Sequence, residues 1–440
     1  MPLDTPLPAD LAVGGFSERP PWLVEPESMP WRAGVGPLRA RTRSEVPRLL
    51  RHRQLPPGRR VLTVGGSLGL ALAGWYLRDK GRPRSRAGLS RRLRIAFERL
   101  GPTYIKLGQI LSSGEGIFPE ELVGEFRLCR DQVPAEPYDT VRRIVEGDLG
   151  RPLGRVFETF ARTPVAAASI AQVHEARLRS GEHVVVKVQR PRVSALVRSD
   201  LAIMSWIAPA LVGRIPVAAL ANPPALVQLF AETIVEELDF RLEADNMLEV
   251  ARVLAETDQR AVVVPRPHPR LVTRRVLVME RLGGFSFDDV AGMRAAGIDT
   301  GAVVRALTVC FLEGATLFGV FHGDLHGGNL FVRPDGKVAL LDYGITGRLD
   351  QPRRLAFLRM LMGGSLNDPM MQLAALRDLG ALPPDTDLAA VVADLGLDQP
   401  VKDPTTMSPE DLLGEVREMT RRLLSYGARF PKVLMLFVKD

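Results

Sequence analysis

The stretch FHGDLHGGNLFVRPDGKVALLDYGITGR, from Phe321 to Arg348, decides the fold of this 440-residue chain. It contains two acidic turns, one around Asp324 and one around Asp342, with Asn329 between them. The apolar runs on either side of Pro334-Asp335-Gly336 predict a β-hairpin. A short hairpin would hold both acidic turns rigidly at one end of a sheet.

The spacing of these polar groups is typical of a phosphoryl-transfer site. His322, Asp324 and Asn329 follow an H-x-D-x-x-x-x-N pattern, and Asp342-Tyr343-Gly344 stands where a metal-binding D-F-G turn would stand. Magnesium prefers hard oxygen ligands, which Asp342 and Asn329 can supply, and Asp324 would accept or orient the proton of an attacking hydroxyl. Singly, such residues usually begin or end turns; together, across a hairpin, they predict a nucleotide site.

Length and composition allow two or three domains with a sizeable core, since the chain is 46% hydrophobic. Cys129 and Cys310 have no paired metal spacing, so neither a disulfide framework nor a zinc site is supported. The positive charge behind the net charge of +7 is concentrated in one segment. The stretch from Arg41 to Arg94 contains fifteen Arg or Lys residues and two acidic residues. Residues 41–94 therefore form a distinct basic segment.

This basic segment flanks Val61 to Leu77, seventeen residues without a charge. That length is at the lower limit for a spanning helix, and basic flanks suit anionic lipid head groups. Gly65, Gly69 and Ala73 would share one helix face, a pattern that permits close helix pairing in lipid. We interpret 61–77 as a membrane helix; a buried soluble helix and a late-starting signal sequence are the alternatives. No interleaved aromatic residues support a nucleic-acid partner.

The rest of the N-terminal region is expected to be a leader followed by helices. Residues 1–40 are rich in Pro and Gly, which predicts a disordered or loosely packed leader. Pro102 can begin a helix that continues to Ser112, with Lys106 and Gln109 on neighbouring sides. On composition alone this is an ordinary amphipathic helix. Residues 118–146 predict two more helices separated by a proline turn.

A β-rich region begins near Val156. An alanine-rich loop, PVAAAS from Pro164 to Ser169, leads into a strand, a Ser180-Gly181 turn and a second strand, Val184 to Val188, in which Lys187 follows three valines. A kinase uses this lysine position to bring an ammonium group to the α- and β-phosphates. Phosphate-covering loops are normally glycine-rich, so the alanines predict a stiffer loop.

A helix is predicted from Leu226 to Met247, and its carboxylates exceed what a solvated face requires. One of them should pair with Lys187 in a closed nucleotide site, and spacing does not choose among them. The candidates are Glu236, Glu237, Asp239 and Glu243.

The next elements predict the link between two lobes and a helical lobe. Strands at 271–273 and 275–282 form a pair, and the backbone around Glu280 and Leu282 would hold an adenine edge. Gly301 to Phe321 is strongly apolar, which predicts a buried helical spine. Beyond Arg348 the chain reads as helical and stops in the apolar run Pro431 to Asp440.

Taken together, the chain resembles the UbiB/AarF (ABC1-type) atypical protein-kinase-like family, closely from about Arg92 to Arg348 and loosely to Asp440. The loop reads Asp324-Leu325 where the family usually has Asp-Pro, and Tyr343 replaces the usual Phe, but neither change removes a ligand. The matching positions are Lys106 to Gln109 (K-x-G-Q), Ala166, Ala167, Ala168 and Ser169 (alanine-rich loop), Lys187, Glu237 and Asp239 (E-x-D), Glu243, Asp324, Asn329 and Asp342.

The resemblance implies an α+β, bilobal protein-kinase-like fold. Its parts would be a helical extension at 95–150, an N-lobe at 151–282 and a helical C-lobe at 283–440. The extension would cover the protein-substrate groove and place Lys106 and Gln109 in the active site, against Glu237 and Asp239. Glu243 would pair with Lys187. The implied cofactors are ATP or ADP with Mg²⁺, and Mn²⁺ as an alternative metal.

The function implied by the resemblance is that of a membrane-associated ATPase or kinase in quinone or isoprenoid-lipid metabolism. Its expected place is the cytoplasmic face of a membrane, peripheral or anchored by the 61–77 helix. Expected partners are a nucleotide, an isoprenoid or quinone-type lipid, quinone-pathway enzymes and a second copy of the chain. Two alternatives stay open: a nucleotide-responsive pseudokinase scaffold and a small-molecule phosphotransferase.

Overall fold

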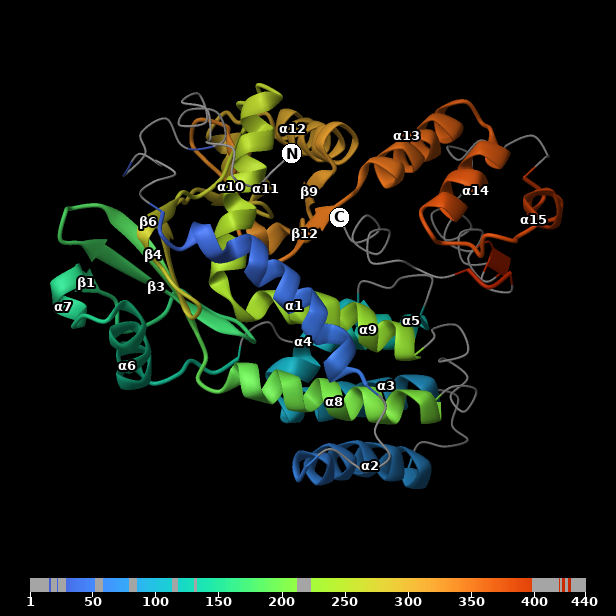
Figure 1. The fold of residues 1–440 in the computed structure, drawn as a ribbon, viewed down its shortest axis with the longest axis horizontal. Helices are drawn as coiled ribbons and strands as arrows, with labels where there is room; N and C mark the ends of the chain where they lie inside the picture. The colour runs from blue at the N-terminus through green and yellow to red at the C-terminus, as the bar shows by residue number, and fades with distance from the viewer. Residues whose placement is uncertain are drawn as a thin grey trace.

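The computed structural model describes residues 29–51, 58–78, 85–112, 118–129, 133–211 and 223–397, with Phe16, Trp22 and a few positions between 419 and 428. In Figure 1 a twisted sheet lies to one side, a block of helices lies beneath it, and a helical lobe extends above and away from it. This is the mixed α+β, kinase-like architecture that the sequence predicts, with an added N-terminal helical region.

The N-lobe sheet carries the predicted nucleotide lysine. Its strand order is β1-β3-β4-β7-β6, with β2 paired to β3. β3 and β4 are antiparallel and place Val173 opposite Lys187, as the strand-turn-strand pattern predicts. The strands are β1 (Phe157–Phe160), β2 (Ala166–Ala167), β3 (Ala171–Leu178), β4 (His183–Gln189), β6 (Pro267–Val272) and β7 (Val276–Glu280).

The predicted catalytic hairpin is present. β10 and β11 pair antiparallel with Phe331 opposite Ala339, and Gly336 has a φ of 81° in the intervening turn, a conformation that glycine adopts without strain. The hairpin belongs to the four-stranded sheet β5-β11-β10-β8. A third sheet, of two strands, joins the two ends of the Phe321 to Arg348 stretch, because β9 pairs with β12. These strands are β5 (Val262–Val263), β8 (Phe285–Ser286), β9 (Val320–His322), β10 (Leu330–Val332), β11 (Val338–Leu340) and β12 (Thr346–Arg348).

Most helices of the N-terminal half of the chain pack as one block beneath the sheet. They share a core that includes Val64, Tyr104, Phe126, Leu201 and Phe230. The helices of this block are α1 (Val35–Leu49, after the 3-10 turn Arg32–Gly34), α2 (Arg60–Arg78), α3 (Ser85–Leu100), α4 (Pro102–Ser112), α5 (Glu120–Arg127), α8 (Val193–Leu211) and α9 (Pro223–Ile234). The two other helices of this half, α6 (Tyr138–Leu149) and α7 (Leu153–Val156), pack against the sheet and share a core with its strands.

Part of the expected leader is folded into the core, contrary to the prediction for residues 1–40. Phe16 is 2% exposed, Met29 and Trp31 are buried, and α1 begins at Val35. The Trp22 indole nitrogen donates to the carbonyl of Pro267 at 3.0 Å. Apolar burial is strongly favourable, so these aromatic anchors overcome the Pro and Gly content around them.

The single helix predicted from Leu226 to Met247 is instead two helices. α9 ends at Ile234, a 3-10 turn spans Glu236–Leu238, and α10 runs Phe240–Glu256. Asp239 has an extended backbone and its carboxylate accepts a hydrogen bond from the backbone N–H of Arg241, which makes it the N-cap of α10. An aspartate is a strong N-cap, so a new helix begins here despite the continuous apolar spacing.

The helix predicted as a buried spine over Gly301 to Phe321 lies largely at the surface. α12 spans Thr300–Glu313 and continues as a π-helical turn over Gly314–Phe318 before β9 begins. Val304 is 52% exposed and Leu317 is 58% exposed. Among the described residues, Thr300–Phe318 is the helix long and apolar enough to cross a membrane, and 17% of its apolar window is buried.

The remaining described helices complete the C-lobe. The predicted helical continuation after Arg348 is present as far as residue 397, and the apolar run Pro431 to Asp440 lies outside the described residues. These helices are α11 (Val290–Ala295), α13 (Gln351–Ser365), α14 (Pro369–Asp378) and α15 (Leu388–Leu395).

Candidate functional site

Lys187 joins the sheet, α10 and the Asp342-Tyr343-Gly344 turn, which is the predicted metal-binding turn. Its Nζ lies 2.6 Å from Oε1 of Glu243 and 3.1 Å from Oδ1 of Asp342. Glu243 is thus the partner among the four candidate carboxylates. The Lys187 side chain is 13% exposed and that of Glu243 is 4% exposed. Burial works against the ammonium, but Asp342 and Glu243 raise the pKa of Lys187 above its ordinary value, so the lysine stays charged.

Asp342 is held in an unusual backbone conformation at the edge of this network. Its φ is 54°, which is uncommon for a residue with a side chain, and its Oδ1 accepts the backbone N–H of Gly344 at 3.2 Å. Burial opposes ionisation, yet Lys187 and Lys106 hold the pKa of Asp342 well below its usual range. The side chain is 48% exposed, so an ionised carboxylate presents a free face to a cation.

His322 ties the catalytic loop to the metal-binding turn. Its Nε2 donates to the backbone carbonyls of Leu341 and Asp342, at 3.1 and 2.9 Å, and its Nδ1 accepts the N–H of Asp324 at 3.1 Å. Burial lowers the pKa of His322, which suits the neutral imidazole that this arrangement requires. One buried ring therefore fixes the distance between the two acidic turns.

The Asn329 side chain is held by its own loop. Its Nδ2 donates to the backbone carbonyl of Asp324 at 3.0 Å, within the 3-10 turn Gly327–Asn329. The amide nitrogen is thereby committed to the backbone, and the carbonyl oxygen is the atom left to serve as a ligand. His326 lies 3.7 Å from Oδ1 of Asp324, so a second imidazole borders the expected base.

The extension places α4 against this site as expected. Lys106 Nζ lies 3.0 Å from Oε1 of Glu237. Burial again opposes the charge, but Glu237, Asp324 and Asp342 raise the pKa of Lys106. Gly108 lets the helix approach α5, because a Cβ there would lie 2.7 Å from the ring of Phe126.

Asp239 has a structural partner, which differs from the expected pairing with Lys106 or Gln109. Besides capping α10, its carboxylate binds the guanidinium of Arg241 at 2.7 Å. Gln109 lies on α4, one turn beyond Lys106. The two acidic residues of the E-x-D pattern therefore have different contacts. Glu237 faces the extension, and Asp239 begins the helix that carries Glu243.

The alanine-rich loop is anchored at both ends. Ala166 and Ala167 pair with β3, and the N–H of Ala168 donates to the carbonyl of Ala171 at 2.8 Å. The Arg190 side chain donates to the Ala168 carbonyl at 2.9 Å. Ser169 is buried at the end of the loop. These bonds fix the two ends of the loop, and its stiffness stays a prediction.

The expected adenine-binding link lies at the end of β7. Glu280 is the last residue of this strand, and its N–H donates to the carbonyl of Arg266 at 2.9 Å. The Glu280 carboxylate accepts the N–H of Arg266 at 3.3 Å. Leu282 follows two residues later, in the segment that connects the lobes.

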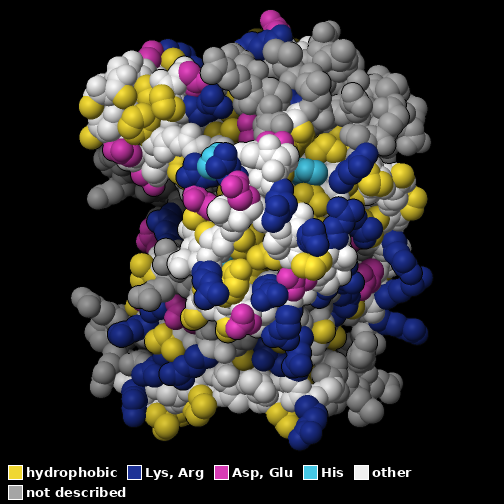
Figure 2. Space-filling view, turned by 90° about the vertical axis from the view of Figure 1, so that its left-hand side faces the viewer, with side chains coloured by type: hydrophobic (Ala, Val, Ile, Leu, Met, Phe, Trp, Pro, Cys, Tyr) yellow, Lys and Arg dark blue, Asp and Glu magenta, His cyan; other side chains and the backbone are white. Residues whose placement is uncertain are grey.

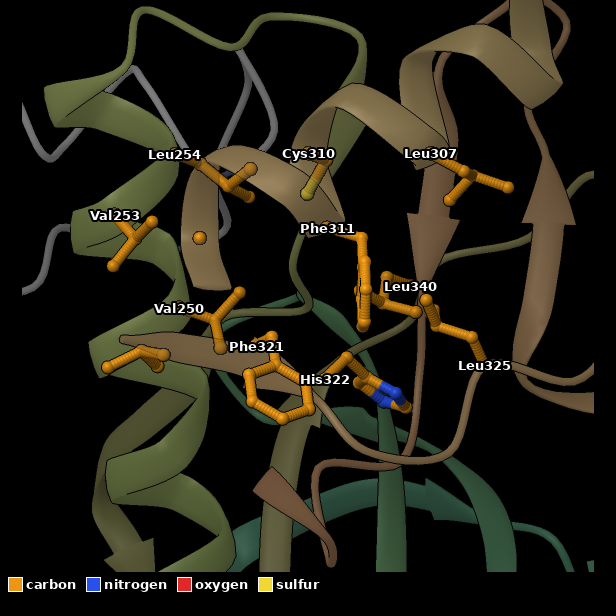
Figure 3. A pocket seen from close by; sticks show the side chains of 12 residues that line it. Val250, Val253, Leu254, Leu307, Cys310, Phe311, Phe321, His322, Leu325 and Leu340 are labelled. Atoms are coloured by element: carbon orange, nitrogen blue, oxygen red, sulfur yellow. The ribbon is translucent and has the colours of Figure 1, made fainter. Parts of the chain in front are cut away.

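A small apolar cavity lies behind the catalytic loop, between α10, α12 and β9 (Figure 3). Its volume is about 20 Å³. A cavity of that size holds about one water molecule, so it is not where a nucleotide would bind. Side chains that line it include Val250, Leu254, Cys310, Phe311, Phe321 and Leu325.

Comparison with known proteins places this geometry in a family. Residues 128–372 match the ABC1 atypical kinase-like domain, which is more than half of the chain. The chain belongs to the ABC1 atypical kinase-like family. Membership implies a kinase-like, ATP-binding protein, and it confirms the UbiB/AarF resemblance seen in the sequence.

Similar proteins occur in bacteria and plants. An uncharacterized protein of Mycobacterium tuberculosis is 37% identical over 350 residues, which cover 78% of this chain and 71% of that one. An uncharacterized aarF domain-containing protein kinase of Arabidopsis thaliana chloroplasts is 34% identical, with 79% and 69% covered. The probable protein kinase UbiB of Aeromonas hydrophila is 34% identical, with 68% of this chain and 56% of that protein covered.

The structure also assigns contacts that the sequence patterns did not single out. Asn246 hydrogen bonds to the backbone of the metal-binding turn, and His322 bonds both acidic turns. The signal for Asn246 was its place three residues after Glu243, which sets the two side chains on neighbouring parts of one helix face. No pattern indicates that its target would be the carbonyl of Tyr343.

Proposed function

We propose that this protein transfers or hydrolyses the terminal phosphoryl group of ATP with a divalent metal ion. The observation that carries the proposal is the joint contact of Lys187 with Glu243 at 2.6 Å and with Asp342 at 3.1 Å. A charged, fixed lysine beside an ionised, half-exposed carboxylate is the arrangement that holds a nucleotide and its metal.

The residues present fit magnesium. Asp342 and Asn329 offer hard oxygen atoms, and magnesium is usually held by one or two carboxylates together with phosphate oxygens and water. Among the described residues, no group of three or more His, Cys, Asp or Glu side chains forms a denser metal site. When bound, the metal would neutralise charge on the phosphates.

The chain's own residues would do the remaining work. Lys187 would bind the phosphates, and Glu243 would keep its ammonium in place. Asp324, whose N–H is held by His322, would accept or orient the proton of the attacking hydroxyl or water. Lys106 and Gln109 would enter from the extension, and Lys106 would add positive charge close to Asp324 and Asp342. The covering extension favours a small acceptor over a protein substrate.

Phosphate release from ATP by the full chain tests the proposal. Asp342→Asn keeps the size of the side chain and removes its charge, so we expect turnover to fall about a hundredfold or more. Asp335→Asn, in the exposed hairpin turn, is the matched control and should retain wild-type turnover. Full turnover in Asp342→Asn would contradict the proposal.

A membrane surface is the proposed working place of the protein. Leu62, Leu70 and Leu77 of α2 are 74%, 72% and 79% exposed. Figure 2 shows hydrophobic side chains interleaved with Lys and Arg at the lower edge of the molecule, where α2 lies. Exposed apolar residues within a basic segment suit an anionic lipid surface. An isoprenoid or quinone-type lipid is the proposed acceptor class, a link supported by similarity to proteins named UbiB.

Co-sedimentation with vesicles tests the membrane proposal. The full chain should bind vesicles that contain anionic lipid, and Leu70→Ser combined with Leu77→Ser should weaken this binding about tenfold, because two leucines would no longer insert. Equal binding by the double variant would contradict a role for α2.

A nucleotide-responsive scaffold is the second candidate, favoured by the anchored alanine-rich loop. Such a loop offers fewer backbone N–H groups to the phosphates than a glycine-rich loop does. A scaffold would bind nucleotide with magnesium, but the wild type would release phosphate no faster than Asp342→Asn does.

A further inference from the structure

Asn246 on α10 uses both ends of its side-chain amide. It is 1% exposed. Its Nδ2 donates to the backbone carbonyl of Tyr343 at 2.8 Å, and its Oδ1 accepts from Nη2 of Arg39 at 3.1 Å and Nη2 of Arg348 at 2.7 Å. Guanidinium groups only donate and a carbonyl only accepts, so the amide has one orientation that satisfies all three partners.

The carbonyl that Asn246 binds belongs to the metal-binding turn. Tyr343 follows Asp342, whose φ of 54° has a free-energy cost that neighbouring contacts must offset. The same helix carries Glu243 one turn earlier, where it holds Lys187. α10 therefore fixes the phosphate-binding lysine with one side chain and the metal-binding turn with another.

The N-terminal helix α1 fixes Asn246 in turn. Arg39 is 7% exposed and bridges two neighbouring residues of α10, because its Nη2 also lies 2.7 Å from Oδ2 of Asp245. Asp245 is buried and has Arg32 as a second cation at 3.6 Å. A buried ion pair of this kind is costly to break, so α1 and α10 are held in one register.

We propose that Asn246 is a positioning residue for the metal-binding turn, and that Arg39 of α1 holds it in place. The match to the ABC1 domain begins at residue 128, so α1 acts on the kinase-like site from outside the matched domain. The metal role of the turn rests on the proposed function, but the positioning itself is a property of the chain without ligands.

Amide hydrogen exchange of the full chain, without nucleotide, tests the positioning. Asn246→Asp keeps an acceptor for Arg39 and Arg348 and removes the donor to Tyr343. We expect the peptide covering 341–347 to exchange about tenfold faster, the usual consequence of losing one buried hydrogen bond. Arg39→Met should accelerate the same peptide, and Arg43→Met, at a side chain 60% exposed on the same helix, should not.

Unchanged exchange of this peptide in Asn246→Asp would overturn the proposal. Asn246→Ala, which adds no charge, is the second variant if the aspartate prevents folding. Acceleration throughout the protein, equal in all peptides, would show a general loss of stability and would equally overturn it.

A titration with Mg²⁺ distinguishes a positioning residue from one that only stabilises the fold, because loss of general stability would not change the Mg²⁺ concentration needed for half-maximal stabilisation by ATP. In Asn246→Asp, the Mg²⁺ concentration for half-maximal stabilisation by ATP should rise about tenfold, while stabilisation by ATP without metal stays the same. An unchanged midpoint would contradict the positioning role. Absence of any magnesium-dependent stabilisation in the wild type would count against the proposed function, and the exchange result would still decide the role of Asn246.

Discussion

Helices α10 and α12 line the same small cavity, yet they differ in a way that their compositions do not suggest (Figure 3). α12 is the more apolar sequence, but Val304 and Val309 are 52% and 44% exposed. α10 mixes charged and apolar residues, and it buries Glu243, Asp245 and Asn246 along with its apolar side. Position in the fold, rather than apolar content, decides which helix is buried.

The reason lies in the neighbours of each helix. α10 contacts the N-lobe strands β6 and β7, the strand β9 before the catalytic loop, and α1. Its buried polar residues have charged or backbone partners on other parts of the chain, as Glu243 does with Lys187 of β4. α12 contacts α11, β5 and its own π-helical turn. Buried polar groups need partners, and α10 is where the lobes supply them.

The largest effect should follow from removing an apolar side chain of α10. Met247 is fully buried within the main core cluster. Met247→Ala should lower the free energy of unfolding by about 2 to 5 kcal/mol, because the change loses apolar burial and leaves a cavity. Urea unfolding of the full chain measures this difference. A loss below about 1 kcal/mol would contradict the conclusion that α10 is the buried helix of the two.

The smallest effect should follow from the matching change at the end of α12. Leu317 is 58% exposed in the π-helical turn. Leu317→Ala should change the free energy of unfolding by no more than about 0.5 kcal/mol, since little apolar surface returns to water. The same urea experiment applies. A loss near that of Met247→Ala would mean that another surface covers α12 in solution.

Much of the site could be predicted because its chemistry is local in sequence. The hairpin between Asp324 and Asp342 follows from apolar runs and a Pro-Asp-Gly turn, and Lys187 follows from a valine-rich strand. The pairing of Lys187 with Glu243 needed the family resemblance, since four carboxylates had suitable spacing. The contact of Lys106 with Glu237 also came from the resemblance and not from helical periodicity.

The rest could not be predicted because it depends on partners distant in sequence. Asp239 is the N-cap of α10 and so divides the predicted single helix in two. In the sequence, an aspartate within an apolar pattern is equally compatible with a helix cap and with a solvent-exposed position in a continuous helix. Phe16 and Trp31 fold from a Pro-rich leader into a core that α10 forms with residues of both lobes. Arg39 reaches α10 across some two hundred residues of chain, which no local pattern encodes.

The central claim is that Asp342, fixed beside Lys187, binds a metal together with a nucleotide, and the thermal shift of the full chain tests it most directly. The full chain is required because Arg39 of α1 holds Asn246, which binds the backbone next to Asp342. At a hundred times the Kd, ATP with magnesium should stabilise the folded state by about 2.7 kcal/mol and raise the Tm of the wild type and of Asp335→Asn. Asp342→Asn should lose the magnesium-dependent part of this rise. An equal, magnesium-dependent rise in Asp342→Asn, or none in a folded wild type, would contradict it.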